Sequence, residues 1–190
     1  MGGGSLFLSD RLMLRDVSWG DLEARRIWWE DADVTRHLGL SDGRQVARRR
    51  VRGQKPSMEW TIALREGGEP IGIVQLGPID QEAEEAWLGL VIGRKDLWGQ
   101  GFGRETVGLI LQVAFDVVGL RRVRLEVEAR HRAACRLYER SGFRRDGERG
   151  GAGGTLDGEA QLLEMSVTRE DWDRRREMEG DGPGAGTCSP

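Results

Sequence analysis

One short stretch constrains the fold of this chain more than any other. In Leu97–Glu105, LWGQGFGRE, glycine stands at three alternate positions, 99, 101 and 103. The apolar run AWLGLVIG (86–93) precedes it, and the amphipathic run ETVGLILQVAFDVV (105–118) follows it. A short continuous apolar run is typical of a buried strand, and apolar residues three and four apart are typical of a helix with one buried face. The stretch therefore predicts a strand, a glycine turn and a helix.

A glycine turn between a strand and a helix can cradle an anion. Backbone N–H groups point into such a turn, the helix N-terminus adds about half a positive charge, and glycine lets the backbone approach a phosphate closely. The spacing is not the Gly-x-Gly-x-x-Gly of dinucleotide-binding proteins, and no Gly-Lys-Ser/Thr of a P-loop follows. Two alternatives remain, an anion site and a glycine-rich turn without a ligand.

The rest of the chain predicts a mixed sheet with helices on both faces, an α/β fold. Strands are expected in 6–17, 57–66, 69–77, 86–93 and 121–129, and in a closing hairpin around the glycine-rich turn 150–154. Helices are expected in 18–30, 42–52, 105–118 and 132–141, and from Thr168 to about Glu179. Ser18 and Asp21 have capping-box spacing, as do Thr168 and Asp171. Pro78–Glu85 is expected to be an acidic loop.

Length and composition indicate one globular domain. The chain has 190 residues, of which 38% are hydrophobic and 32% charged. We expect a flexible leader at 1–9, a single domain at 10–178 and a flexible Gly/Pro tail at 179–190. No apolar run approaches the roughly 18 residues of a membrane span, and the first residues, MGGGSLFL, do not resemble a secretory signal.

Charge and cysteine usage exclude further classes. The net charge of -3 argues against a nucleic-acid partner. Cys135 and Cys188 make no disulfide framework, which favours a cytoplasmic location. His37 and His131 are the only histidines, so no metal site is expected.

Beyond the glycine loop, the sequence resembles the GNAT superfamily of acetyl-CoA-dependent N-acetyltransferases. Within it, the chain looks most like the Rim-type branch, which includes ribosomal-protein N-terminal acetyltransferases and small-molecule acetyltransferases. The resemblance rests on 89–148, where the loop, a strand and RLYERSGF follow at the family's spacing, with support from 59–80 and 162–172. It spans about 12–172 and implies the GNAT fold, a mostly antiparallel mixed sheet with helices on both faces and a splayed pair of central strands.

The resemblance implies a set of CoA contacts. In GNAT enzymes the strand before the loop pairs with the pantetheine arm, and the loop amides hold the pyrophosphate. The first loop residue of the family is usually glutamine or arginine. Here it is Trp98, and tryptophan at this position is common in the Rim-type branch. Arg104 either adds a charge near a CoA phosphate or is a solvated arginine at a helix start. The strand residues are Leu90, Val91 and Ile92, and the loop residues are Gly99, Gln100, Gly101, Phe102, Gly103 and Arg104.

Two side chains after the loop carry further expectations. Tyr138, the only tyrosine, falls where many GNAT enzymes place the tyrosine that protonates the departing CoA thiolate. The alternative is an aromatic ring packed in the core. His131 stands where the family usually has an asparagine that contacts pantetheine or the acetyl region. It could donate a hydrogen bond or act as a base near neutral pH, or it could be a surface histidine.

The general base is left open among three carboxylates and a water chain. Relatives often use a glutamate in the middle of the strand before the loop, and this chain has Trp87 near that place. The candidates are Glu85, the nearest upstream carboxylate, and Glu126 and Glu128 on the facing strand. Each could instead be an ordinary solvated charge at a strand edge.

The resemblance therefore implies acetyl transfer from acetyl-CoA to a primary amine, by direct attack in a ternary complex. Acidic side chains in 30–33 and 80–85 favour a cationic acceptor of the aminoglycoside or polyamine type, with antibiotic resistance as one outcome. The alternatives are a protein N-terminus, as in ribosomal-protein acetyltransferases, and a non-catalytic CoA-binding module. No nucleic-acid or membrane partner is expected, and a homodimer is left open.

Overall fold

A computed structural model describes residues 6–36, 56–155 and 158–180. It contains one sheet of eight strands in the order β1-β2-β3-β4-β5-β6-β8-β7. Of these neighbours, β5 and β6 run parallel and the others antiparallel. The strands are β1 (Leu6–Leu8), β2 (Leu12–Arg15), β3 (Met58–Leu64), β4 (Pro70–Asp80), β5 (Glu85–Ile92), β6 (Arg122–Glu128), β7 (Arg144–Thr155) and β8 (Gly158–Thr168).

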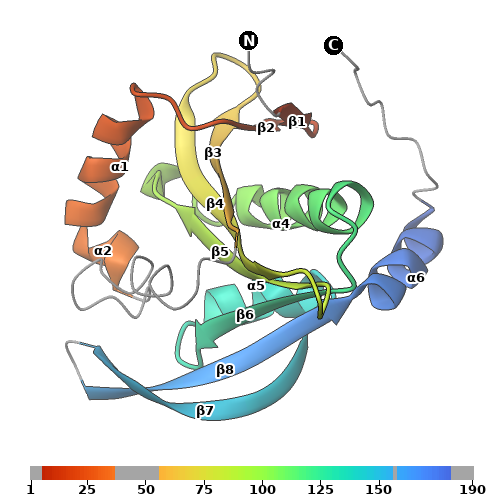
Figure 1. Ribbon diagram of the computed structural model, residues 1–190. Coiled ribbons are helices and arrows are strands. Elements are labelled where there is room, and N and C mark those ends of the chain that lie inside the picture. Colours follow the sequence, from red (N-terminus) through yellow and green to blue (C-terminus); the bar gives the residue numbers. More distant parts are fainter. Residues whose placement is uncertain (1–5, 37–55, 156–157, 181–190) are drawn as a thin grey trace.

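Helices cover both faces of this twisted sheet (Figure 1). One face packs against α4 and α5, where the main core contains the largest buried side chains, among them Phe115 and Leu125. The other face carries α1 and α2, whose Trp28 and Val34 pack on Ile73 of β4. The helices are α1 (Asp21–Glu30), α2 (Ala32–Thr35), the 3-10 turn η1 (Lys95–Leu97), α4 (Phe102–Gln112), the π-helical turn η2 (Val113–Val117), α5 (Arg132–Arg140) and α6 (Arg169–Glu179).

The main helix after the glycine loop begins earlier and ends differently than expected. Its α-helical part starts at Phe102 rather than Glu105, and its last turn, η2, is π-helical. Gly119, the residue directly after the predicted helix 105–118, has φ 80° and lies one residue past the C-cap Val118. The N–H of Leu120 returns to the carbonyl of Ala114, so the positive φ of Gly119 lets the chain turn back toward β6.

Helix α1 starts two residues later than the capping-box spacing predicts. Its N-cap is Gly20, and Ser18 instead donates to the Asp21 carboxylate from its N–H and its hydroxyl. The same carboxylate accepts from both Nη atoms of Arg15 at 2.7 Å and from the Thr61 hydroxyl at 2.9 Å. Asp21 is buried, so this network fixes the start of α1 on β2 and β3.

Three boundaries also differ from the sequence prediction. Strand β1 lies inside the expected leader, and its Phe7 ring meets Trp60 edge-on. The acidic loop is shorter than predicted, because β4 extends to Asp80 and β5 begins at Glu85. Residues 150–154, expected to be a turn, belong to β7. The helix predicted for 42–52 and most of the predicted tail lie outside the described residues, whereas Thr168 caps α6 as expected.

No helix within the described ranges is both long and apolar enough to cross a membrane.

Candidate active site

The central feature of the site is a split between β5 and β6. The two strands pair at three positions only, Glu85 with Arg122, Ala86 with Val123 and Trp87 with Arg124. Beyond them β5 continues to pair with β4 as far as Ile92, and β6 pairs with β8 (Figure 1). The splayed pair of strands is therefore confirmed. From Leu88 onward, β5 has no strand partner on its β6 side among the residues that the structure describes.

The first residue of the glycine loop is bound to the end of this unpaired edge. Trp98 is 45% exposed, and its indole Nε1 donates to the carbonyl oxygen of Ile92 at 2.8 Å. Of the three residues expected to pair with pantetheine, Ile92 thus has its carbonyl engaged within the protein. Leu90 and Val91 lie between this contact and the closed end of the split.

The glycine loop leads into a helix start that no side chain caps. Gly99 and Gly101 have φ 76° and 87°, in the left-handed region, and Gly101 is the N-cap of α4. A Cβ at Gly99 would meet nothing within 4 Å. Glycine is therefore needed at this position for its left-handed backbone conformation and not for lack of space. The first N–H groups of a helix have no intrahelical partner, and here the preceding loop is exposed. This arrangement suits an anion.

Gly103 has a different role from the other two glycines. A Cβ there would lie 3.2 Å from Cδ2 of Leu137 on α5. Its missing side chain therefore lets α4 and α5 pack closely, which places the Tyr138 helix beside the loop helix.

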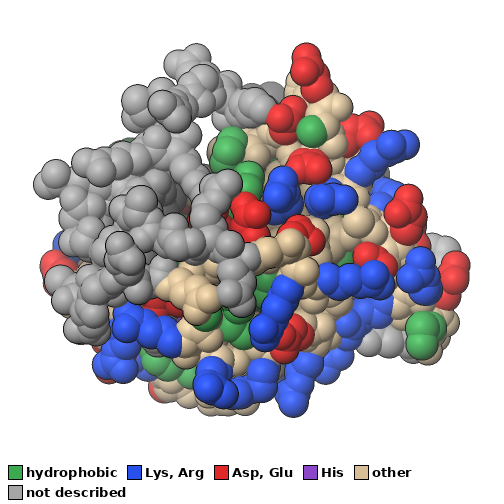
Figure 2. Space-filling model, turned by 90° about the horizontal axis from the view of Figure 1, so that it is seen from below, with side chains coloured by type: hydrophobic (Ala, Val, Ile, Leu, Met, Phe, Trp, Pro, Cys, Tyr) green, Lys and Arg blue, Asp and Glu red, His purple; other side chains and the backbone are tan. Residues whose placement is uncertain are grey.

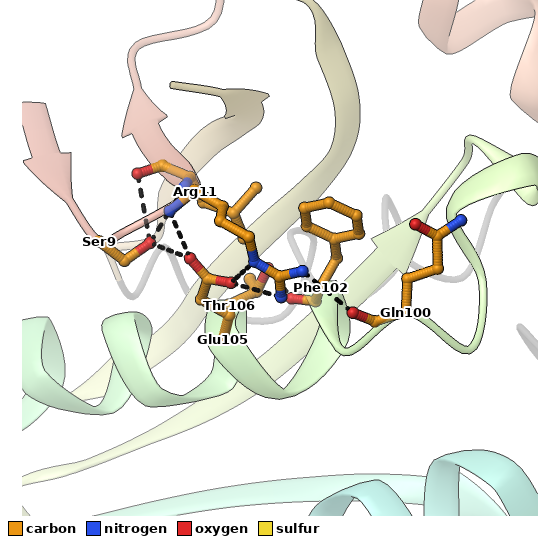
Figure 3. A network of polar contacts seen from close by, with 7 residues as sticks. Ser9, Arg11, Gln100, Phe102, Glu105 and Thr106 are labelled. Atoms are coloured by element: carbon orange, nitrogen blue, oxygen red, sulfur yellow. Dashed lines mark hydrogen bonds and ion pairs between the residues drawn. The ribbon is translucent and has the colours of Figure 1, made fainter. Parts of the chain in front are cut away.

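An arginine from the N-terminal hairpin contacts the loop, and sequence reasoning missed it (Figure 3). The guanidinium of Arg11 pairs with the carboxylate of Glu105 in the first turn of α4, with Nη2 and Oε2 2.7 Å apart. Its Nη1 donates to the Gln100 carbonyl at 3.2 Å. Burial alone would raise the pKa of Glu105, but hydrogen bonds from Arg11 and Ser9 outweigh it and lower that pKa. Some 94 residues separate Arg11 from Glu105, so no local pattern signals the contact.

Tyr138 is buried on α5. Its side chain is 8% exposed, and its ring meets Phe143 edge-on at 5.6 Å between centroids. Burial raises the pKa of Tyr138 to about 12, so the hydroxyl stays protonated at neutral pH and can act as a donor. No hydrogen bond joins this hydroxyl to the residues that the structure describes. The ring packing predicted as the alternative is present, and it leaves the donor role open.

His131 is the N-cap residue of α5, with no side-chain capping bond. Its backbone N–H donates to the Glu128 carbonyl at 2.9 Å, which turns the chain from β6 into α5. The buried thiol of Cys135 donates weakly to the same carbonyl, at 3.5 Å, and burial raises its pKa. The thiol is therefore not activated as a nucleophile.

The three candidate bases occupy different positions along the split. Glu85 lies at its closed end, with Oε2 3.4 Å from Nη1 of Arg124. Glu126 and Glu128 lie further along β6, on the face opposite the buried Val123, Leu125 and Val127. Glu126 is half-buried, whereas Glu128 is 1% exposed and pairs with Arg130 at 3.1 Å. The structure thus separates Glu85 from the other two.

The acidic side chains expected to attract a cationic acceptor are largely ion-paired. Lys95 lies 2.7 Å from Asp31 and 3.1 Å from Asp33, and its hydrogen bond lowers the pKa of Asp31. Glu84 pairs with Arg121 at 2.8 Å. On the face seen in Figure 2, basic and acidic side chains are likewise interspersed. Paired carboxylates attract a cation less strongly than free ones.

Four tryptophans near the site, which could have lined an acceptor pocket, are used mainly in packing. Trp60 is 2% exposed in the main core. Trp28 is 6% exposed and covers Gly93, where a Cβ would lie 2.1 Å from its ring. Trp87 stacks with the Arg124 guanidinium at 5.2 Å, at the closed end of the split. Trp29 is half-buried, with Arg25 at 5.5 Å from its ring.

Within the described part of the chain, no three His, Cys, Asp or Glu side chains are grouped to hold a metal ion.

Comparisons with known proteins agree with this geometry. The model of the "Acetyltransferase (GNAT) domain" family matches residues 11–144. The uncharacterized N-acetyltransferase p20 of Bacillus licheniformis is 27% identical over 149 residues, which cover 73% of this chain and 82% of the relative. The uncharacterized N-acetyltransferase YoaA of Bacillus subtilis is 26% identical over 147 residues, with the same coverage.

Solved structures share the fold at low identity. A spermidine N-acetyltransferase from Vibrio cholerae, in complex with CoA and spermine, matches with a TM-score of 0.75 and 18% identity, covering 86% of this chain and 99% of that one. A GNAT-family acetyltransferase from Bacillus anthracis matches with a TM-score of 0.72 and 18% identity, covering 87% and 99%.

The matched domain model includes the split strands, the glycine loop and the Tyr138 helix. The chain therefore belongs to the GNAT acetyltransferase family, and it is an acyltransferase.

Proposed function

We propose that this protein transfers an acetyl group from acetyl-CoA to a primary amine by direct attack in a ternary complex. One observation carries the proposal: two left-handed glycines lead into a helix start without a side-chain cap, beside a strand edge that has no strand partner within the described ranges. Donor amides, an open backbone at Gly99 and a free strand edge are what a pyrophosphate and a pantetheine amide require. Acetyl-CoA, when bound, supplies the activated thioester. The Rim-type assignment belongs to this proposal and rests on motif spacing.

The backbone is proposed to do most of the binding. Amides from Gly99 to Arg104 would hold the pyrophosphate, with the α4 dipole adding to their field. The edge of β5 at Leu90 and Val91 would pair with the pantetheine arm, and an amide of this edge would polarise the thioester carbonyl. His131, at the start of α5, would contribute a donor to the same arm.

Tyr138 is proposed to donate a hydrogen bond to the sulfur as negative charge develops there. Burial raises the pKa of Tyr138 to about 12, whereas an ordinary thiol has a pKa near ~8.5. Complete proton transfer would therefore be uphill by about 3.5 units, roughly 5 kcal/mol. The buried phenol is better suited to stabilising the charge through a hydrogen bond than to giving up its proton completely.

A base must remove a proton from the acceptor, because an ammonium group has a pKa near ~10 and cannot attack. Glu126 is half-buried along the open part of the split, Glu85 is half-buried at its closed end beside Arg124, and Glu128 is buried beside Arg130. Glutamine variants at the three positions separate the candidates. Replacing the base should lower kcat/KM most at low pH, where removal of the proton is hardest, and replacing the other two should not.

The acceptor is proposed to be a small cationic amine of the polyamine or aminoglycoside type. The spermidine N-acetyltransferase from Vibrio cholerae that shares the fold binds spermine, which supports this class. The acidic side chains in 30–33 and 80–85 are largely ion-paired, so their attraction for a cationic acceptor is weakened. The support for a cationic amine therefore comes from the similar spermidine N-acetyltransferase more than from charge.

A thiol-release assay tests the proposal. The protein is incubated with acetyl-CoA and a panel of polyamines, aminoglycosides and peptides with free N-termini. Turnover with a polyamine or aminoglycoside supports it, and turnover with peptides alone moves the acceptor to protein N-termini. Tight acetyl-CoA binding without turnover of any amine would contradict the catalytic assignment of Tyr138 and the carboxylates.

A further inference from the structure

We propose that Arg11 is a positioning residue for the CoA-binding loop, which it holds in shape and relieves of a repulsive charge. The inference rests on the proposed function of the same loop. Arg11 lies in the turn between β1 and β2, 89 residues before Gln100 of the loop that it contacts (Figure 3).

The first part of the argument is the charge of Glu105. This carboxylate lies in the first turn of α4, the helix whose start would receive the pyrophosphate, and its side chain is 17% exposed. A negative charge there competes with a phosphate for the same helix dipole and repels it. Arg11 neutralises that charge from Nε and Nη2, each 2.7 Å from Oε2.

The carboxylate is also fixed in orientation. Its Oε1 accepts from the backbone N–H of Arg11 and from the Ser9 hydroxyl, both at 2.8 Å. Both oxygens are thus turned toward the β1–β2 turn, where Arg11 compensates their charge.

The second part of the argument is the loop backbone. Arg11 contacts the residues on both sides of Gly101: Nη1 donates to the Gln100 carbonyl at 3.2 Å, and the guanidinium lies 4.2 Å from the Phe102 ring centroid. A Cβ built on Gly101 would be 3.4 Å from Nη2, so the guanidinium lies against the left-handed glycine itself. Because glycine has the most backbone freedom, an external contact here removes alternative loop shapes before the ligand arrives.

The ion pair between Arg11 and Glu105 contributes little to the global stability of the fold. The Arg11 side chain is 48% exposed, and exposed pairs contribute little to folding. Its loss should therefore appear in the affinity of the loop for phosphate more than in the melting temperature.

The test is a double-mutant cycle read with two acetyl donors. Acetyl-CoA carries the pyrophosphate, and acetyl-pantetheine lacks it. We expect Arg11→Gln to raise the KM and Kd for acetyl-CoA about tenfold, as the loss of a charge-assisted contact does. The kcat, and the kcat/KM for acetyl-pantetheine, should stay within about twofold, because Arg11 acts only through the phosphate site.

Two further variants separate charge from packing. Arg11→Gln combined with Glu105→Gln should regain most of the lost affinity, because the repelling carboxylate is gone. Arg11→Lys should keep the neutralisation but lose the two-sided contact with the loop, and so should lie between the wild type and Arg11→Gln. The matched control is Arg144→Gln, which removes another exposed arginine–carboxylate pair, far from the loop in sequence, and should change neither donor's constants.

Three results overturn the inference. One is an equal loss with both donors, which indicates general structural damage. Another is a double variant no better than Arg11→Gln, and the third is wild-type affinity in Arg11→Gln. If Arg11→Gln fails to fold, acetyl-CoA binding by Glu105→Gln alone tests the inference. The inference predicts that this variant binds acetyl-CoA as tightly as the wild type or more tightly, whereas a purely structural role of the pair predicts weaker binding. A wild-type protein that does not bind acetyl-CoA at all overturns the proposed function and this inference together.

Discussion

Replacing Tyr138 with phenylalanine removes a single hydroxyl from a side chain that is 8% exposed and keeps its edge-to-face contact with Phe143. The ring still fills its place, so the fold should be retained. If the hydroxyl donates to the sulfur in the transition state, the single-turnover rate should fall by about 100-fold, equivalent to about 2.7 kcal/mol. The KM for acetyl-CoA should change little, because the hydrogen bond strengthens only as charge develops.

The same substitution should change how stability depends on pH. Burial raises the pKa of Tyr138 from 10.0 to about 12, so the folded state holds this proton more tightly than the unfolded state. Its contribution to stability is complete below pH 10 and is lost as the pH rises from 10 through 12. The two-unit difference corresponds to roughly 2.7 kcal/mol. Relative to the wild type, Tyr138→Phe should therefore gain stability over this interval.

Rapid-quench measurement of a single turnover separates the chemical step from product release, and urea denaturation between pH 8 and 11.5 follows the stability. Phe143→Leu serves as a control, since it disturbs the ring packing and keeps the hydroxyl. A Tyr138→Phe variant with the wild-type single-turnover rate would refute the donor role and leave the tyrosine as a packed aromatic. A wild-type slope of stability against pH in that variant would refute the assigned pKa.

Other substitutions test the site and its supports. Gly101→Val should weaken acetyl-CoA binding in calorimetry by more than tenfold, because a β-branched side chain disfavours φ 87°; normal binding would exclude this loop as the cradle. Gly93→Ala should lower the free energy of unfolding by about 2 kcal/mol or more through displacement of Trp28, and by much less in a Trp28→Ala background. Asp21→Asn should lower it by about 3 kcal/mol at pH 7 by breaking the pair with Arg15. Burial would raise the pKa of Asp21, but hydrogen bonds from Arg15, Ser18 and Thr61 hold it well below its usual range. The carboxylate's contribution is therefore present above the unfolded pKa near ~3.9 and is lost at lower pH, so a constant difference down to pH 2 would argue against the network.

Local patterns were sufficient to predict most elements of the fold. The hairpin around Gly67-Gly68, the α5 helix and the Thr168 cap follow from alternation, helical spacing and capping residues, which act within a few positions. The start of α1 could not be predicted in this way. Ser18 has the right spacing for a cap, but Asp21 is bound by Arg15 and by Thr61, a residue 40 positions further along. A tertiary network thus moved the helix start.

The candidate site was predicted where backbone conformation defines it and missed where distant residues meet. Gly99 and Gly101 have left-handed conformations, as expected of a glycine turn that can cradle an anion. Gly103 proved to be a packing position, because its neighbour Leu137 comes from another helix. Arg11 could not be found from sequence patterns, since its partners lie about 90 residues away. The three carboxylates looked alike in sequence, and their positions along the split and their burial now distinguish them.

The central claim is that the start of α4 holds the pyrophosphate of acetyl-CoA, and thermal unfolding with and without ligand tests it most directly. At one hundred times its dissociation constant, acetyl-CoA should add about 2.7 kcal/mol to the free energy of unfolding, a shift of several degrees in Tm. NAD should give no such shift, because the spacing of the glycines is not that of a dinucleotide-binding loop. In the Gly101→Val variant at the same acetyl-CoA concentration the shift should fall to about half or less, because tenfold weaker binding leaves only about 1.4 kcal/mol. Equal protection by NAD, or full protection by acetyl-CoA in the variant, would contradict the account.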